Sequence, residues 1–322
     1  MKLIRVHAHG GPEVLQVEEA EVPHAGPGQA LLRIEAVGVN FVEIYHRTGL
    51  YKMPVPFTLG TEAAGTVEAV GPGVTTVRPG DRVGSINVLG AYAEYALAPA
   101  DRLVPLPDRV STRQAAAVLL QGVTAHYLTT STFPLQRGQA CLVHAAAGGV
   151  GLLLCQIAKQ RGARVLGTVS TEEKAKAARQ AGASEAILYT QTDFAAAVQR
   201  LTDGRGVDVI YDSVGQTTFA KGLDCLRPRG TMVVYGQASG PIAPVDTGLL
   251  STKGCLYLTR VNLGTYTATR QELEARSGDI FSWVGSGQLK VHIHGEYPLA
   301  EAGKAQAALE HRETIGKVLL VP

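Results

Sequence analysis

The amino-acid sequence predicts an α/β protein in which a doubly wound parallel sheet is inserted into a second, β-rich domain. Two observations predict this. Short strand-like segments separated by Gly and Pro turns fill the first 115 or so residues, roughly, and strands then alternate with helices from residue 140 onward. Because 322 residues exceed what one core usually supports, we expect a β-rich domain at residues 1–120 and 263–322. The parallel-sheet domain is expected at residues 121–262.

The β-rich part is predicted from its strands and turns. Residues 1–7 alternate apolar and polar side chains, which predicts a strand and not a secretory signal. Residues 30–37 and 65–70 are further strand-like segments. Turn sequences such as Gly26-Pro27-Gly28 and Gly71-Pro72-Gly73 separate them. Several short strands with such turns favour a barrel-like module.

The parallel-sheet part is predicted from its alternation of strands and helices. Residues 140–144 form a continuous apolar run, as expected for a strand buried on both faces. Such βαβ alternation favours a doubly wound sheet with right-handed crossovers. The expected strands are 140–144, 164–169, 207–212 and 230–236, and the expected helices are 114–128, 151–161 and 172–181. A helix over 297–311 and a strand over 316–321 close the chain.

Composition excludes several classes of protein. Apolar residues make up 45% and charged residues 18%, which is typical of a folded chain. A net charge of +2 gives no strong field for nucleic acid or an anionic membrane. Apolar runs such as 152–155 fall far short of the ~20 residues that span a bilayer. We therefore expect neither a nucleic-acid nor a membrane partner.

The cysteines indicate a reducing compartment. Cys141, Cys155, Cys225 and Cys255 lie in apolar segments, and no two of them form a C-x-x-C pair. We expect four buried, reduced thiols in a cytoplasmic protein, with neither a disulfide framework nor a zinc site.

A small-residue loop follows the first strand of the predicted parallel sheet. Its sequence, Ala146-x-Gly148-x-x-Gly151, is the dinucleotide fingerprint with Ala in place of the first Gly. Small residues let the backbone approach a pyrophosphate, and the following helix N-terminus presents free N–H groups to it. With a strand before it and a helix after it, the loop predicts a Rossmann nucleotide site.

The end of the next strand favours NADPH over NADH. An NAD site usually carries an acid there to hold the ribose hydroxyls, but this chain has Ser170-Thr171 and then Lys174. Hydroxyls and a cation suit a 2′-phosphate. Ser170 with Glu173 also fits a helix-capping box, so Ser170 is alternatively a helix cap, and the nearby Glu172 and Glu173 weaken the NADPH assignment slightly.

Further motifs lie along the whole chain, at residues 9–15, 38–43, 59–65, 138–159, 211–215 and 316–318. Together they resemble the quinone oxidoreductase and zeta-crystallin group of zinc-free medium-chain dehydrogenases/reductases, nearest to its bacterial NADPH:quinone reductases. The resemblance runs the whole length and implies a GroES-like catalytic domain, a Rossmann domain and a homodimer joined through the Rossmann sheets.

Zinc-containing relatives carry a Cys, a Gly-His-Glu run and a later Cys or acid. Here Asn40 stands at the first Cys position, and Gly60-Thr61-Glu62 lacks the His. Zinc needs three or four N, S or O ligands, so we expect no metal site.

The resemblance also implies the cofactor contacts. Arg312 would reach the cofactor phosphates, or alternatively is a solvated charge at a helix end. The run Tyr235-Gly236-Gln237-Ala238 departs from the more common Phe-Gly-Asn-Ser type, which leaves its backbone for contact. The implied residues are Asn40, Phe41, Thr124, Tyr127, Gly148, Gly149, Val150, Ser170, Lys174, Tyr189, Ser213, Tyr235, Gly236, Ala238, Val261, Leu263 and Arg312.

The expected reaction is NADPH-dependent reduction of a quinone by hydride transfer without a metal. The developing oxyanion then needs hydrogen-bond donors, for which Asn40, Tyr45 and Tyr51 are the candidates. Tyr51 lies in a turn and is alternatively a surface or packing residue. His126 and His144 are expected to pack, and His292-x-His294 to form a strand edge.

Two alternative functions stay open. Sister families with this fold and cofactor reduce enal or enone C=C bonds. Relatives have also been recruited as a lens crystallin or as binders of AU-rich RNA, a non-catalytic role. A net charge of +2 with 6% aromatic residues gives neither a basic groove nor a stacking platform for RNA.

Overall fold

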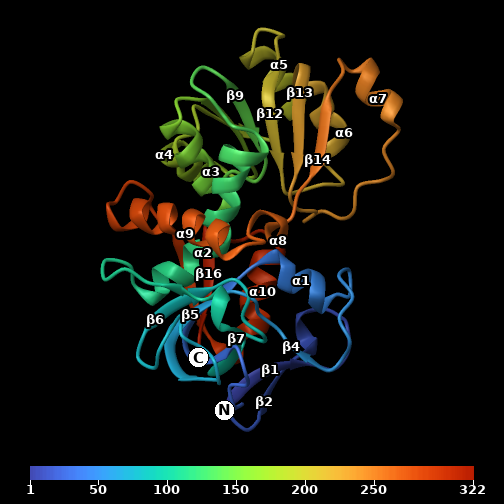
Figure 1. Ribbon diagram of the computed structural model, residues 1–322. Helices are drawn as coiled ribbons and strands as arrows, with labels where there is room; N and C mark the ends of the chain where they lie inside the picture. The colour runs from blue at the N-terminus through green and yellow to red at the C-terminus, as the bar shows by residue number, and fades with distance from the viewer. The chain divides into compact units, whose positions relative to one another are not determined.

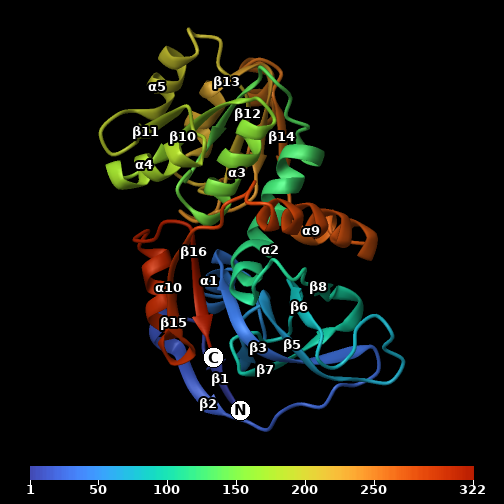
Figure 2. The ribbon, with the colours of Figure 1, turned by 90° about the vertical axis from the view of Figure 1, so that its left-hand side faces the viewer.

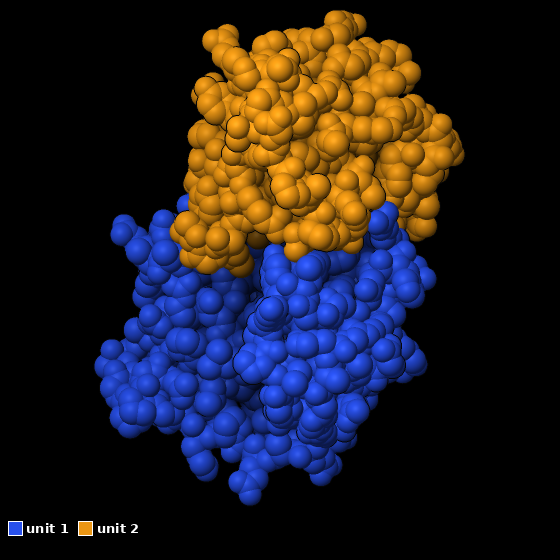
Figure 3. Space-filling model, turned by 90° about the vertical axis from the view of Figure 1, so that its right-hand side faces the viewer, with its two compact units in different colours: residues 1–123, 267–322 blue, residues 124–266 orange.

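The computed structural model describes residues 1–322, which form two compact units (Figures 1 and 3). Unit 1 comprises Met1–Val123 and Thr267–Pro322, and unit 2 comprises Thr124–Tyr266. Unit 1 is thus built from both ends of the chain, with unit 2 inserted between them.

Unit 1 contains a seven-stranded sheet and a three-stranded sheet. The larger one has the order β15-β16-β3-β5-β6-β8, and β7 also pairs with β3. The C-terminal strand β16 pairs antiparallel with β3, which brings the two chain segments of unit 1 into one sheet. The strands of the larger sheet are β3 (Gln29–Val39), β5 (Ala63–Val70), β6 (Arg82–Ser85), β7 (Tyr95–Pro99), β8 (Val104–Pro105), β15 (Ile293–Pro298) and β16 (Lys317–Val321). The smaller sheet has β1 (Lys2–Val6) between β2 (Leu15–Glu19) and β4 (Phe57–Thr58).

Unit 1 also contains four α-helices. They are α1 (Phe41–Arg47), α2 (Thr112–Tyr127, which ends in unit 2), α9 (Arg270–Gly285) and α10 (Ala302–Glu310). The expected helix over 297–311 is wrong in its first turn, because Tyr297 and Pro298 end β15 and a 3-10 turn at Leu299–Glu301 leads into α10. The residue before a proline disfavours the α conformation, which explains why the helix starts later.

Unit 2 contains a six-stranded parallel sheet with the order β11-β10-β9-β12-β13-β14 (Figures 1 and 2). The strand order reverses between β9 and β12, so that the carboxyl ends of these two strands flank the switch point where such sheets bind ligands. The predicted fold class is confirmed. The strands are β9 (Ala140–Val143), β10 (Arg164–Val169), β11 (Glu185–Leu188), β12 (Val207–Asp212), β13 (Leu226–Val234) and β14 (Tyr257–Arg260).

Helices cover both faces of this sheet. On one face, α5 and α6 share a core with the strands: Phe194, Val198, Phe219 and Leu223 pack with Leu142, Leu166, Ile210 and Met232. Helices α3 and α4 lie side by side (Figure 2). The helices are α3 (Gly149–Gln160), α4 (Glu172–Ala181), α5 (Phe194–Leu201), α6 (Phe219–Gly222), α7 (Thr247–Thr252) and α8 (Leu263–Tyr266).

The cysteines differ from expectation at one position. All four are free, and Cys141, Cys155 and Cys225 are buried, but Cys255 is exposed. The expectation that all four are buried is therefore wrong for Cys255. This residue lies in the turn between α7 and β14, with φ of 56°, and such connecting turns run over the surface.

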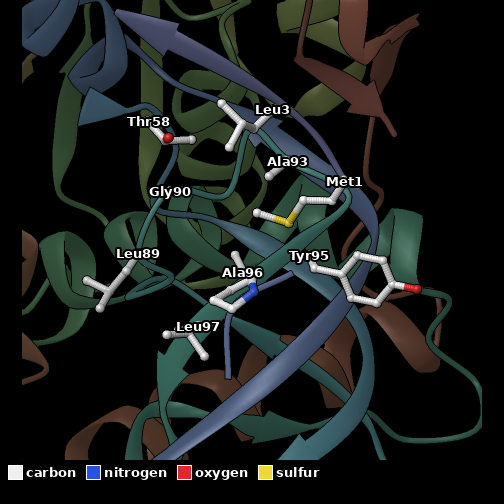
Figure 4. A pocket seen from close by; sticks show the side chains of 10 residues that line it. Met1, Leu3, Thr58, Leu89, Gly90, Ala93, Tyr95, Ala96 and Leu97 are labelled. Atoms are coloured by element: carbon white, nitrogen blue, oxygen red, sulfur yellow. The ribbon is translucent and has the colours of Figure 1, made fainter. Parts of the chain in front are cut away.

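A shallow apolar hollow in unit 1 is too small for a dinucleotide. Its volume is about 190 Å³, below the ~300 Å³ at which small-molecule pockets usually begin. Figure 4 shows the side chains that line it, among them Leu3, Leu89, Tyr95 and Leu97. None of the predicted site residues lines it. No helix of the protein is both long and apolar enough to cross a membrane.

Candidate functional site

The predicted nucleotide loop joins β9 to α3 at the switch point of unit 2. The turn closes through a hydrogen bond from the Gly148 N–H to the Ala145 carbonyl (2.9 Å), and Ala145 adopts a φ of 52°. A Cβ on Gly151 would lie 2.3 Å from the Ala145 oxygen. Only glycine therefore lets α3 begin this close to the loop.

The first turn of α3 is open to an anion. Gly148 is its N-cap, Gly149 and Val150 are its first residues, and no side chain caps it. The turn carries no acidic residue. Because the first N–H groups of a helix lack internal partners and the dipole end is positive, this turn suits a pyrophosphate.

His144 packs beneath the loop, as expected. It is fully buried, its Nδ1 lies 2.9 Å from Thr168 Oγ1, and its ring meets Phe194 edge-on. Burial lowers the pKa of its imidazole. It therefore joins β9 to β10 behind the nucleotide loop as a neutral ring.

The end of β10 has no carboxylate, and the two hydroxyl residues that follow it, Ser170 and Thr171, have different positions relative to α4. The cap of α4 is Thr171, whose side chain accepts from the Lys174 N–H (3.3 Å). The alternative expectation of a cap at Ser170 is wrong by one residue, because the helix begins at Glu172. Ser170 instead precedes the cap, directly after the last residue of β10.

Tyr189 is brought beside this strand end by the neighbouring strand. The Tyr189 N–H donates to the Val169 carbonyl (3.1 Å), and Thr190 Oγ1 donates to the Ser170 carbonyl (3.0 Å). The nearby acid Glu172 pairs with Arg179 at 2.8 Å. Ser170 and Tyr189 thus lie at the ends of adjacent strands, and Lys174 lies in the first turn of the following helix. Glu172 is paired with Arg179.

The ends of β12 and β13 are tied to each other. The Ala238 N–H donates to the Ser213 carbonyl (3.0 Å), and the side chains of Tyr235 and Ser213 are hydrogen-bonded. A Cβ on Gly236 would lie 2.7 Å from the Ser213 oxygen. Burial raises the pKa of Tyr235. In this part of the predicted site, the backbone at Gly236 lies close against the backbone of Ser213.

The remaining predicted residues of unit 2 lie after β14, in α8 and at the end of α2. The Val261 N–H donates to the Val234 carbonyl (3.0 Å), which continues β14, and Leu263 begins α8. Tyr127 is buried and stacks on Tyr266, with ring centroids 4.2 Å apart and planes 4° from parallel. Thr124 lies one helical turn before Tyr127 and is also buried.

Unit 1 holds the predicted acceptor residues on and just after α1. Phe41 begins the helix, Tyr45 is buried within it, and Tyr51 follows it with 38% of its surface exposed. The Tyr45 ring lies 6.1 Å from Phe41 and meets Tyr51 edge-on at 5.1 Å. The three rings form one aromatic group, so the turn that carries Tyr51 brings it to the helix. Arg312 is exposed and follows α10, with φ of 61°.

The Asn40 side chain is engaged inside unit 1. Its Nδ2 donates to the Gly38 carbonyl (3.0 Å) and to Glu62 Oε2 (2.9 Å), and its Oδ1 accepts from Lys317 Nζ (2.6 Å). Both amide hydrogens are thus directed at protein oxygens. This geometry ties Asn40 to β3, to β16 and to the segment before β5 at the start of α1.

Glu43 is a second buried carboxylate beside Asn40. It accepts from the Asn40 N–H (2.8 Å) and from Thr61 Oγ1 (3.0 Å). Its complete burial raises the pKa of its carboxyl to about 7, while Lys317 and Thr61 act in the opposite direction.

Sequence reasoning missed Glu43, Glu62 and Lys317 as a group. Lys317 is separated from Glu62 by 255 positions, and their atoms meet only because β16 joins the sheet of β3. One local signal was present: Lys317 is a lone charge at the start of an otherwise apolar strand.

Two family descriptions match the chain. Residues 26–108 match the alcohol dehydrogenase GroES-like domain, and residues 149–277 match the zinc-binding dehydrogenase family. The donor set does not fit the zinc that the second name implies. Asn40 and Thr61 stand where Cys and His would be needed, and Asn40 Oδ1 and Glu62 Oε2 both accept from Lys317 at 2.6 Å. No cluster of three or more His, Cys, Asp or Glu side chains is placed to hold a metal.

Whole-chain relatives carry the resemblance further. A quinone oxidoreductase of Pseudomonas aeruginosa is 46% identical over 100% of this chain and 99% of its own length. A 2-haloacrylate reductase of a Burkholderia species is 43% identical over 98% of each chain. A crystal structure of Escherichia coli quinone oxidoreductase complexed with NADPH is 44% identical, covers 100% of both chains and has a TM-score of 0.98. The chain belongs to the quinone oxidoreductase family of the medium-chain dehydrogenases/reductases.

Proposed function

We propose that the protein is an NADPH-dependent quinone oxidoreductase that works without a metal. The observation that carries the proposal is the nucleotide edge of unit 2. An uncapped, acid-free α3 follows a loop closed by Gly148 and Gly151, and the neighbouring strand ends in hydroxyl residues without a carboxylate. The relative from E. coli with which this chain shares its fold is an NADPH complex.

The cofactor contacts of the proposal follow the strand ends. The backbone N–H groups at Gly149 and Val150 bind the pyrophosphate, and Ser170 and Lys174 bind the 2′-phosphate beside Tyr189. A lysine or hydroxyl donor to a phosphate forms a charge-assisted hydrogen bond, which is stronger than a neutral one. The other contacts of the proposal are Thr124, Tyr127, Ser213, Tyr235, Gly236, Ala238, Val261, Leu263 and Arg312, with Asn40 and Phe41.

In the proposed reaction, NADPH supplies a hydride to the quinone, which becomes a hydroquinone anion and then takes one proton from water. The side chains assigned to the growing negative charge are Tyr45 and Tyr51, whose O–H groups donate hydrogen bonds. Asn40 holds the start of α1, because its own amide is engaged by Gly38 and Glu62. Most of the rate then comes from orientation of the two flat reactants.

The experiment is NADPH oxidation with benzoquinone, naphthoquinones, enals and 2-haloacrylate in parallel. We expect the quinones to have the highest kcat/KM. Tyr51→Phe should lower kcat with benzoquinone by about tenfold or more, whereas the matched variant Tyr95→Phe, in a strand of unit 1, should not change it. Faster turnover of the enals or acrylates than of every quinone would overturn the assignment of substrate.

We infer further that the protein forms a homodimer through the edge strand β14. This strand ends the parallel sheet, and its neighbouring side chains Tyr257 and Leu258 are 62% and 36% exposed. An open edge strand presents unpaired N–H and C=O groups and pairs readily with another chain. A second copy related by a two-fold axis would cover both the edge and the two apolar side chains.

The dimer is tested by light scattering coupled to gel filtration. Tyr257→Glu should convert the dimer to a monomer, because a charge would be buried at the joint. Leu89→Glu alters an equally exposed apolar residue of unit 1, 61% exposed, and should leave the dimer intact. A monomeric wild type, or a Tyr257→Glu variant that stays dimeric, would contradict this inference.

The proposal places the protein in the cytoplasm. The support is chemical: all four cysteines are free, and three of them are buried within cores. Thiols persist in that form in the reducing cytoplasm. Fractionation of the source cells with an antibody against the protein tests this placement.

A further inference from the structure

Unit 1 encloses a polar network that the nucleotide site does not use. The ammonium of Lys317 donates to Glu62 Oε2 and to Asn40 Oδ1, each at 2.6 Å. Lys317 is 1% exposed and Glu62 is fully buried. The network therefore joins β16, the segment before β5 and the residue that precedes α1.

Every oxygen of Glu62 has a partner. Oε2 accepts from Lys317 and Asn40, and Oε1 accepts from the Leu120 N–H of α2 at 2.6 Å. Taking a carboxylate out of water is costly unless a cation pairs with it, and Lys317 is the cation that pairs with Glu62. The ammonium is thus the cation around which these elements meet.

Two glycines, Gly38 and Gly316, leave the space that the side chain of Glu62 and the backbone before Lys317 occupy. A Cβ on Gly38 would lie 2.2 Å from Glu62 Oε2. Gly316, directly before Lys317, has a φ of 74°, and a Cβ there would lie 2.3 Å from the His292 carbonyl. The chain can therefore deliver the lysine and hold the carboxylate only with glycine at both positions.

The network ends on the helix that carries the aromatic group. Asn40 is the N-cap residue of α1, and Glu43 in its first turn binds the Asn40 N–H. The rings of Phe41, Tyr45 and Tyr51 follow from this start. Removal of the cation would take away the bond to Asn40 Oδ1 and so loosen the residue from which α1 starts.

We propose that Lys317 is a positioning residue: an internal cation that fixes Asn40 and the first turn of α1, and through them the aromatic group that binds the acceptor. A buried ion pair is often no better for stability than apolar residues of the same volume. Its use here is to select one geometry. The catalytic half of the proposal rests on the proposed function; the structural half does not.

The test compares two neutralised pairs. Lys317→Met with Glu62→Gln removes the network's charges together and so avoids an unpaired buried charge. Lys304→Met with Glu301→Gln neutralises a lysine–glutamate pair of the surface, 2.9 Å apart, as the matched control. Each protein is assayed for hydrogen exchange of residues 41–47, for kcat with benzoquinone, and for NADPH affinity by fluorescence.

The buried double variant should exchange the α1 amides about tenfold faster or more. Its kcat should fall by about tenfold to a hundredfold. The NADPH contacts of α3 and α4 are untouched, so any rise in the NADPH Kd reflects only the contacts assigned to Asn40 and Phe41. The control pair should change none of these. Asn40→Ala keeps the ion pair, so it reports faster α1 exchange even if the double variant does not fold.

Wild-type exchange of α1 in the folded double variant would overturn the positioning role of Lys317, and wild-type exchange in Asn40→Ala would overturn its route through Asn40. Fast α1 exchange with an unchanged kcat would overturn its catalytic half. If no quinone supported NADPH oxidation by the wild type, the proposed function would be contradicted. The exchange measurement would still decide whether Lys317 holds α1.

Discussion

Gly38→Ala would place one methyl group against the carboxylate of Glu62 and the backbone of α2. Its Cβ would lie 2.2 Å from Glu62 Oε2 and 2.5 Å from the Ala116 carbonyl, where ordinary contact begins at 3.4 Å. Either atom must move by about 1 Å. The carboxylate cannot do so without lengthening its 2.6 Å bonds to Lys317 and the Leu120 N–H. Overpacking of a core costs about 1–3 kcal/mol, and we expect the upper end, because both blocking atoms are fixed.

For a unit of this size, about 3 kcal/mol lowers the melting temperature by roughly 6–12 °C. Differential scanning calorimetry measures this shift. The matched variant is Gly278→Ala in α9, where no atom lies within 4 Å of the added Cβ. It should stabilise by up to ~1 kcal/mol, because alanine favours a helix interior. A melting temperature of Gly38→Ala within about 2 °C of the wild type would refute the reasoning.

Three further predictions address the cofactor and the buried acid. Gly151→Ala should raise the NADPH Kd about tenfold to a hundredfold in a fluorescence titration, because its Cβ would lie 2.3 Å from the Ala145 oxygen of the loop; an unchanged Kd would show that the loop does not hold the pyrophosphate. Lys174→Glu should raise the NADPH KM at least about tenfold and leave the NADH KM within about twofold, with Lys176→Glu on the same helix as control; equal effects on both cofactors would sink the phosphate contact. Burial raises the pKa of Glu43 from 4.5 to about 7, so the folded state keeps a proton that the unfolded chain releases. The stability of the wild type relative to Glu43→Gln should fall by up to about 3 kcal/mol as pH rises from about 4.5 to 7 and then level off, and parallel curves in urea denaturation would contradict this.

The nucleotide edge could be predicted from the sequence because its signals are local. Gly148 and Gly151 stand at fixed spacing after an apolar run, and the absence of an acid after residue 169 can be read directly. The cap of α4 differs from the expected one by one residue, because both Ser170 and Thr171 can cap a helix and only the path of β10 decides between them.

The polar network of unit 1 could not be predicted, because its partners are distant in sequence. Lys317 and Asn40 are separated by 277 positions and meet through the pairing of β16 with β3. Helix α1 was missed for a different reason. It has seven residues and begins at the end of a long strand, so that no helical period has room to develop. Asn40 is expected from the sequence to donate to the acceptor, and its bonds to Glu62 and Lys317 could not be expected because those partners are distant in sequence.

Steady-state kinetics of the wild type with benzoquinone and either NADPH or NADH test the proposed function. We expect rapid NADPH oxidation, with kcat/KM about a hundredfold above that with NADH, because two or three charge-assisted hydrogen bonds to the 2′-phosphate are lost with NADH. Equal efficiency with the two cofactors, or no quinone-dependent oxidation of either one, would contradict it.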